Sequence, residues 1–222
     1  MCPFLVEAVQ LIMPSHTYAH PNHINHYKIT YYSNQPYPYR YGQIPTSVST
    51  GLTSLKIMNL NSNRLQGAMD LTFFQQLTKL VAVNVFNNHL VGFVPDSLGS
   101  ATDLMMLYMD RNKLSGYVSA HPQAIPNLKK LAVLQLDDNL LTGSLEFLDK
   151  FTADTYLADG GYVYLNNNSF TGEVNACDIV GNASALDVQH NDLSCYNRCW
   201  GAASLPHKGP PANPGKYTVH NL

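Results

Sequence analysis

Apolar and polar residues recur along this chain in a register of sixteen positions that can be laid down six times. Apolar residues fall at positions 1, 4, 7, 9 and 14, an asparagine falls at position 12, and five of the six units have a glycine at position 16. A repeat period of about 20 to 50 residues is the signature of a solenoid. The sixth unit is degenerate, and the six stretches are LTSLKIMNLNSNRLQG (52–67), LTKLVAVNVFNNHLVG (77–92), ATDLMMLYMDRNKLSG (101–116), LKKLAVLQLDDNLLTG (128–143), LADGGYVYLNNNSFTG (157–172) and VGNASALDVQHNDLSC (180–195).

The alternation inside each unit predicts a β-strand with one buried side. Positions 7 and 9 are apolar and alternate with positions 6, 8 and 10, which is the period-two pattern of such a strand. Positions 1 and 4 have the spacing of a helix or a turn. One unit cannot bury its leucines alone, whereas stacked units can. We therefore expect a strand, a turn and a return segment in each unit, with parallel strands of neighbouring coils about 4.8 Å apart.

Two constant columns of the register are expected to be structural. The asparagine at position 12 follows the strand where the chain turns inward, and its amide can satisfy backbone groups at a buried turn. The glycine at position 16 suits a backbone that needs positive φ or a close approach. The columns are Asn63, Asn88, Asn112, Asn139, Asn168 and Asn191, and Gly67, Gly92, Gly116, Gly143 and Gly172.

The register resembles that of the leucine-rich repeat family. The segment NNHLVGFVP (87–95) matches the form L-x-x-N-x-L-x-G-x-[IV]-P of the plant-type subclass, which occurs in receptor ectodomains and in secreted, polygalacturonase-inhibitor-like proteins. The resemblance implies an α/β fold: a right-handed solenoid of about six repeats with a parallel concave sheet and a mostly irregular or short-helical convex side. It also implies a short second strand after the glycine and recognition of proteins or peptides on the concave side. The proline at position 19 survives only as Pro95, and the paired-cysteine N-terminal cap of plant proteins is absent.

Three segments are predicted along the chain. Residues 1–40 are rich in His, Tyr and Pro and show no stable period, which predicts a poorly ordered N-terminal segment. Residues 41–200 form the repeat domain, and its first residues, YGQIP (41–45), look like the end of an earlier unit. Residues 201–222, which include GPPANPG, are expected to be an extended C-terminal tail.

Composition narrows the function. The net charge is −2 and charged residues make up only 13%, so there is no electrostatic case for nucleic acid or for an anionic membrane. No apolar run approaches the roughly 18 residues that a membrane span needs. We expect no cofactor and no metal. His16, His20, His23 and His26 have helical spacing, but Pro21 argues against a helix there.

The variable positions of the predicted strand are the candidate ligand-binding residues. Aromatic and apolar side chains surrounded by Asn, Asp and Gln are what a recognition face needs. The alternative is that these are the ordinary exposed aromatic residues of a solenoid strand. We expect no catalysis at the acidic residues among them, because an open sheet offers little desolvation. The candidates are Phe86, Met106, Tyr108, Asp110, Val133, Gln135, Asp137, Tyr162 and Tyr164.

Cysteines and sequons supply two further hypotheses. Cys177 and Cys199 occupy nearly matching places in the last two coils, within reach of a disulfide, with Cys195 as the alternative partner of either and free thiols as the alternative to both. Asn167 and Asn182 begin N-x-S sequons and are candidate glycosylation sites.

Taken together, the sequence predicts a non-catalytic, receptor-like module that binds a protein or peptide through a solenoid face. The other hypotheses are a truncated receptor or structural fragment without its own ligand, and a secreted inhibitor of a cell-wall-degrading hydrolase. The plant-type motif and the possible disulfide favour an extracellular or cell-surface location over a cytoplasmic one.

Overall fold

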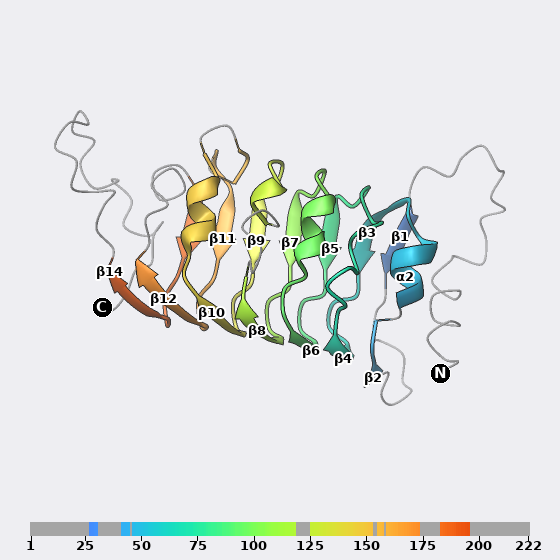
Figure 1. Ribbon diagram of the computed structural model, residues 1–222, viewed down its shortest axis with the longest axis horizontal. Coiled ribbons are helices and arrows are strands. Elements are labelled where there is room, and N and C mark those ends of the chain that lie inside the picture. The colour runs from blue at the N-terminus through green and yellow to red at the C-terminus, as the bar shows by residue number, and fades with distance from the viewer. Residues whose placement is uncertain are drawn as a thin grey trace.

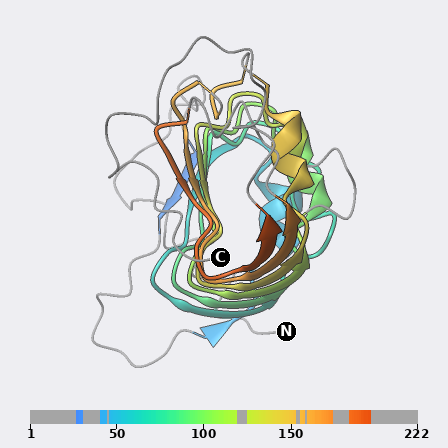
Figure 2. The ribbon, with the colours of Figure 1, turned by 90° about the vertical axis from the view of Figure 1, so that its left-hand side faces the viewer.

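The computed structural model describes residues 27–30, 41–44, 46–118, 125–152, 155–157, 159–173 and 183–195. These residues form a stack of coils in which each coil contributes one strand to each of two parallel sheets (Figure 1). Viewed along the stack, the coils superpose, and the short helices lie on the side opposite the first sheet (Figure 2). The predicted solenoid architecture is therefore confirmed.

The first sheet contains the strand that the register predicted. Its order is β1-β3-β5-β7-β9-β11-β13, and equal repeat positions pair across each strand boundary, as in Leu107 with Leu134. Position 7 is buried in every coil from β3 onward, because it faces the interior of the stack. The strands are β1 (Tyr27–Thr30), β3 (Leu55–Asn59), β5 (Ala82–Asn84), β7 (Met106–Tyr108), β9 (Val133–Gln135), β11 (Tyr162–Tyr164) and β13 (Ala185–Asp187).

The second sheet differs from the expectation in one respect. Each strand begins at position 13 and runs through the position 16 glycine, whereas the resemblance implied a strand after it. The reason is the alternation around position 14, whose apolar side chain is buried between more exposed neighbours, as at Leu114 in β8. The strands are β2 (Tyr41–Gly42), β4 (Arg64–Ala68), β6 (His89–Gly92), β8 (Lys113–Tyr117), β10 (Leu140–Gly143), β12 (Ser169–Glu173) and β14 (Asp192–Cys195).

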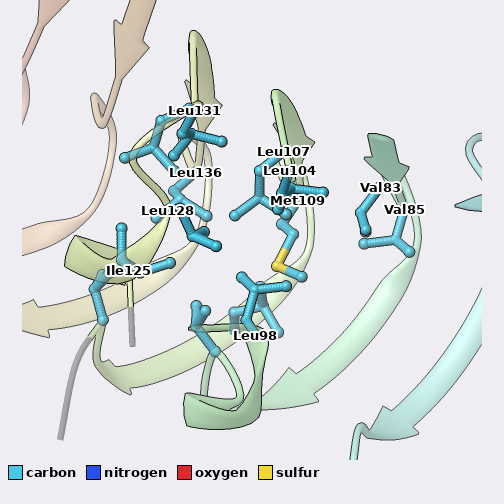
Figure 3. Close-up of a cluster of buried hydrophobic side chains, with 14 of the residues drawn as sticks. Val83, Val85, Leu98, Leu104, Leu107, Met109, Ile125, Leu128, Leu131 and Leu136 are labelled. Atoms are coloured by element: carbon cyan, nitrogen blue, oxygen red, sulfur yellow. The ribbon is translucent and has the colours of Figure 1, made fainter. Parts of the chain in front are cut away.

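Short helical segments and turns close the coils, and leucines fill the space between. In Figure 3, Leu104, Leu107 and Met109 of one coil lie beside Leu131 and Leu136 of the next, all of them buried. Burial of such a side chain stabilises the fold by about 1.5–3 kcal/mol, so no coil is stable without its neighbours. The helices are α2 (Thr46–Gly51), η1 (Asp96–Ser100), η2 (Ile125–Asn127) and η3 (Glu146–Lys150).

The asparagine column satisfies backbone groups at the buried turn, as the sequence predicted, and also forms a hydrogen-bonded ladder between coils, which was not predicted. The amide of Asn112 donates to the carbonyls of Met109 and Asp110 in its own coil and of Val85 in the preceding one, at 3.0–3.1 Å. Its Oδ1 accepts the N–H of Leu90, also in the preceding coil, at 3.0 Å. Asn88, Asn139, Asn168 and Asn191 repeat this pattern. Each asparagine therefore fastens the turn of its own coil to the strand behind it.

A left-handed residue precedes each ladder asparagine, which the sequence analysis did not anticipate. Position 11 has φ between 50° and 54° in every unit, whichever residue occupies it. The turn into the core occurs here while the backbone stays paired; for example, the N–H of Arg111 donates to the carbonyl of Asp137 at 3.0 Å. The residues are Ser62, Asn87, Arg111, Asp138, Asn167 and His190.

The N-terminal segment supplies one strand that was not predicted. Tyr27–Thr30 lies within residues 1–40, for which we expected no element, yet it forms β1 and pairs in parallel with β3. Together with β2 at Tyr41–Gly42, which pairs with β4, it gives each sheet one more strand before the first recognisable repeat. The YKIT strand lacks the leucine and asparagine register, so periodicity did not reveal it. Residues 201–222 lie outside the described residues.

Candidate functional site

Positions 6 and 8 make up the outward face of the first sheet. In β7 the middle residue Leu107 is fully buried, whereas Met106 is 37% exposed and Tyr108 is half-buried. The same alternation holds in β9 and β11, where Tyr162 is 46% exposed. Six of the nine candidate residues belong to these three strands, and we call them the central face: Met106, Tyr108, Val133, Gln135, Tyr162 and Tyr164.

The strand register brings the central face together from residues up to 58 apart in the sequence (Met106 and Tyr164). One row runs Met106, Val133, Tyr162 across neighbouring strands, and the other runs Tyr108, Gln135, Tyr164. Neighbouring members of a row are about 4.8 Å apart at the backbone, close enough for their side chains to act on one ligand. The result is an apolar row beside a row of two tyrosines with a glutamine between them.

Position 8 has a structural duty in the outer coils that it lacks in the central ones. The side chains of Asn59, Asn84 and Asp187 each accept the N–H of position 10, at 3.4, 3.1 and 3.1 Å, and so close the end of the strand. Tyr108, Gln135 and Tyr164 replace them in the three central coils. A tyrosine cannot make this short local turn, so its side chain is left to the surface.

The other three candidates, Phe86, Asp110 and Asp137, occupy position 10, two residues beyond each strand. Asp110 retains only 5% of its surface, and its Oδ1 is buried and without a hydrogen-bond partner among the described residues. Asp137 is half-buried in the next coil. We call these two carboxyl groups the acidic pair.

The pKa values of both members of the acidic pair are raised, mainly by burial. Burial, followed by the carboxylate of Asp137, raises the pKa of Asp110 to about 7, against the smaller opposing effects of its own N–H and of Arg111. Burial likewise raises the pKa of Asp137 to about 6, with a further contribution from Asp138. Both carboxyl groups therefore hold protons near neutral pH more strongly than exposed aspartates do.

Position 11 links neighbouring coils along the edge of the face. The Arg111 guanidinium lies 5.3 Å from the centre of the Phe86 ring, and its Nε is 3.4 Å from Oδ2 of Asp138. Asn167 in turn donates its amide to Oδ1 of Asp138 at 2.7 Å. The side-chain contacts between neighbouring members of this row were not predicted from the sequence. Its only signal was the recurrence of Asn, Asp and His at position 11, residues that tolerate a left-handed backbone.

Only some of the remaining predicted residues lie in the part of the chain that the structure describes. Asn167, the first sequon, is exposed and left-handed, with its amide on Asp138. Asn182, Cys177, Cys199 and the four N-terminal histidines lie outside the described residues, and Cys195 ends β14. In the described part of the chain no group of three or more His, Cys, Asp or Glu side chains could hold a metal ion. Among the described helices, none is long and apolar enough to cross a bilayer.

The fold and the repeat define the class: the chain is a parallel-stranded solenoid with the fold of leucine-rich repeat ectodomains. It is 28% identical over 162 residues to receptor-like protein 41 of Arabidopsis thaliana. This match covers 72% of this chain and 17% of that protein. It is 31% identical over 143 residues to the calmodulin-binding receptor kinase CaMRLK of the same plant, covering 54% and 21%. The chain thus spans about a fifth of the length of these relatives. No known family model matches it.

Solved structures with the same fold have different ligands. The Arabidopsis receptor kinase GASSHO1/SCHENGEN3 ectodomain, in complex with Casparian strip integrity factor 2, matches with a TM-score of 0.58 and 28% identity over 69% of this chain and 17% of its own. The plant peptide hormone receptor RGFR1, in complex with RGF2, matches with a TM-score of 0.58 and 25% identity, over 69% of this chain and 23% of its own. A plant ice-binding protein matches with a TM-score of 0.59 and 28% identity, over 69% of this chain and 46% of its own. The fold alone therefore does not decide what is bound, and the side chains of the face must.

Proposed function

We propose that this chain is a non-catalytic recognition module that binds a peptide, or an extended segment of a protein, across the central face. The observation that carries the proposal is the exchange at position 8. The three central coils give up the local turn made by Asn59, Asn84 and Asp187, and place Tyr108, Gln135 and Tyr164 on the surface instead. The two tyrosines cannot make that turn, so their side chains are available to a ligand.

The chemistry of the central face suits a peptide. Tyrosines supply a large contact area at a low entropic cost and keep a hydroxyl for hydrogen bonds, which is why they are enriched in interface centres. Met106, Val133 and Tyr162 add an apolar row for alternate side chains of an extended ligand. Support also comes from the similarity to RGFR1, whose structure holds RGF2, and to receptor-like protein 41. On the same grounds we propose an extracellular or cell-surface location.

A binding experiment tests the proposal. The purified chain would be panned against a display library of random dodecapeptides, and the selected peptides measured by biolayer interferometry. Tyr108→Ala and Tyr164→Ala should each weaken binding by about tenfold or more, the range of a hot-spot residue. Tyr117→Ala is the matched control, because Tyr117 is 59% exposed on the second sheet. Circular dichroism would verify that all three variants fold.

The outcomes separate the three hypotheses. Selected peptides whose binding is the same for Tyr108→Ala, Tyr164→Ala and Tyr117→Ala would refute the central face as the site. A library that yields no binder would favour a structural fragment without its own ligand. Stoichiometric inhibition of a wall-degrading hydrolase, abolished by the same tyrosine substitutions, would favour the inhibitor hypothesis over the peptide receptor.

A further inference from the structure

The acidic pair lies directly beside the central face. Asp110 and Asp137 each follow a member of the tyrosine row by two residues, Tyr108 and Gln135 respectively. Their backbones belong to adjacent coils, because Tyr108 pairs with Gln135 and the N–H of Arg111 donates to the carbonyl of Asp137. The backbones that carry the two carboxyl groups are therefore about one strand spacing, roughly 4.8 Å, apart.

Among the residues that the structure describes, no basic side chain forms an ion pair with the acidic pair. Arg111 is the neighbouring basic residue, but its guanidinium is engaged with Asp138 and lies over Phe86. Within the described residues neither carboxylate of the pair forms an ion pair, whereas Asp138 and Asp103 do. Asp138 and Asp187 add further negative charge around Asp137. Once the pH exceeds the raised pKa values of the pair, the face therefore combines excess negative charge with tyrosine rings.

The buried oxygen of Asp110 marks where a donor is missing. Its Oδ1 is shielded from solvent and accepts no hydrogen bond from the described residues. A buried acceptor without a partner costs about 1–3 kcal/mol. Oδ1 of Asn61, at position 10 of the first unit, and Oδ1 of Asp96 are also buried without a partner, but Asp110 differs from Asn61 in lying beside the tyrosine row. A ligand whose donor reaches the Asp110 oxygen would recover this free energy.

We propose that Asp110 and Asp137 bind the guanidinium of an arginine side chain carried by the peptide ligand, with Tyr108 and Tyr164 on either side of it. This proposal rests on the proposed function and specifies the chemistry of its ligand. The Arg111 side chain is 61% exposed, and its guanidinium contacts Asp138 at 3.4 Å instead of pairing with Asp110 or Asp137.

An arginine fits the site better than other cations do. Its planar fork has five donors, enough to reach two carboxylates about one strand spacing apart at the same time. Its flat face stacks on tyrosine rings, and Tyr108 and Tyr164 stand two strands apart in one row with Gln135 between them. A lysine ammonium is a point charge that cannot bridge the pair in this way.

The experiment compares peptides that differ only in the side chain that replaces arginine. Peptides selected on the chain would be resynthesised with each arginine replaced by lysine or by citrulline, which keeps the planar shape of arginine but has no charge. We expect citrulline to weaken binding by about tenfold or more, since charge-assisted hydrogen bonds are roughly twice as strong as neutral ones. Lysine should be intermediate. Because these changes are made in the peptide, the fold of the protein is unaffected.

Protein variants test the same contact from the other side. Asp110→Asn and Asp137→Asn should each reduce the arginine-to-citrulline ratio of affinities toward one, while Asp149→Asn, on η3 at the opposite side of the coil, should leave the ratio unchanged. Binding of the arginine peptide should also tighten between pH 5.5 and pH 8, as the acidic pair loses its protons beside Arg111, Asp138 and Asp187. Thermal melting would confirm that the variants fold.

The outcomes distinguish this proposal from the general one. Peptides that need Tyr108 and Tyr164 but show no preference for arginine over citrulline would overturn the arginine site and leave the binding face intact. Lysine that binds as tightly as arginine would overturn the assignment to a planar guanidinium. A chain that binds no peptide would overturn both proposals.

Discussion

The Tyr117 ring lies against Gly143 of the next coil, where a side chain on Gly143 would have to be. A Cβ built on Gly143 would stand 2.2 Å from Cδ1 of Tyr117, and the backbone there has φ of +90°. Phe93 and Gly116 repeat the arrangement one coil earlier, also at 2.2 Å. Position 16 therefore needs glycine for two separate reasons: its left-handed backbone and the side chain that the preceding coil lays over it.

Substitution of these glycines should separate the two reasons. Gly143→Ala should lower the free energy of unfolding by about 2–3 kcal/mol, because it adds a clash to about 1–2 kcal/mol of backbone strain. Gly172→Ala should cost only the strain, since its φ is +82° but its nearest neighbour, Cβ of Ser144, is 3.8 Å away. Urea unfolding would measure both, and equal losses would contradict a contribution from the Tyr117 ring.

The asparagine ladder should be one of the most sensitive features of the fold. Asn112→Ala leaves the buried N–H of Leu90 without an acceptor and removes one of two donors from each of the carbonyls of Val85, Met109 and Asp110, so we expect a loss of about 2–3 kcal/mol. Asn127→Ala is the control, since Asn127 is exposed at the end of η2. A shift of the urea midpoint no larger for Asn112→Ala than for Asn127→Ala would argue against the ladder as a stabilising element.

The left-handed position 11 offers a route to a more stable protein. Ser62 has φ of 54°, which serine adopts with strain and glycine does not. Ser62→Gly should raise the free energy of unfolding by about 0.5–1 kcal/mol, whereas Ser62→Val should lower it by about 1–2 kcal/mol, because a β-branched residue is poorly tolerated there. Thermal melts of the two variants should therefore shift in opposite directions, and shifts of the same sign would contradict the assigned backbone.

The acidic pair predicts an unusual dependence of stability on pH. The pKa of Asp110 is raised in the folded state to about 7 from an ordinary value of 3.8, so the folded chain holds a proton that the unfolded chain has lost. Stability should then fall as the pH rises from about 4 to about 7, with a slope of up to about 1.4 kcal/mol per pH unit. Asp137 adds to the fall up to about pH 6.

Chemical unfolding at several pH values would test this dependence. The midpoint for the unmodified chain should be higher at pH 5 than at pH 8, and Asp110→Asn should flatten the difference because it removes the titrating group. Asp159→Asn, at an exposed position, is carried through the same series as the control. A midpoint that rises from pH 5 to pH 8 would contradict burial of an uncompensated carboxylate at Asp110.

The fold could be predicted because each repeat is a short local pattern, and the same residue types recur at the same positions of successive repeats. Leucines at positions 4 and 7, the asparagine at 12 and the glycine at 16 each recur in several coils, so a single noisy unit did not obscure the pattern. Prediction was weaker where a feature depends on the neighbouring coil. The second strand begins earlier than expected, β1 has no register of its own, and the left-handed residue at position 11 varies in identity from Ser62 to His190.

The candidate site shows the same division. The sequence identified the tyrosines and the aspartates as variable residues on an exposed strand. It could not show that Asn59, Asn84 and Asp187 are occupied in local turns while Tyr108, Gln135 and Tyr164 are not, because that difference lies in hydrogen bonds. Nor could it show that Asp110 is buried, since position 10 looks exposed by alternation alone.

The repeat register alone was enough to predict that this protein is a stacked solenoid, which residues fill its interior, and that the asparagine and glycine columns are structural. These features follow from burial and turn chemistry within a single unit, repeated six times. The stacked coils were needed to show which surface residues meet, which carboxyl groups are buried away from water, and which glycines are covered by an aromatic ring of the preceding coil. Those relationships join residues one coil apart, and their energies depend on distances and burial that exist only once the coils are stacked.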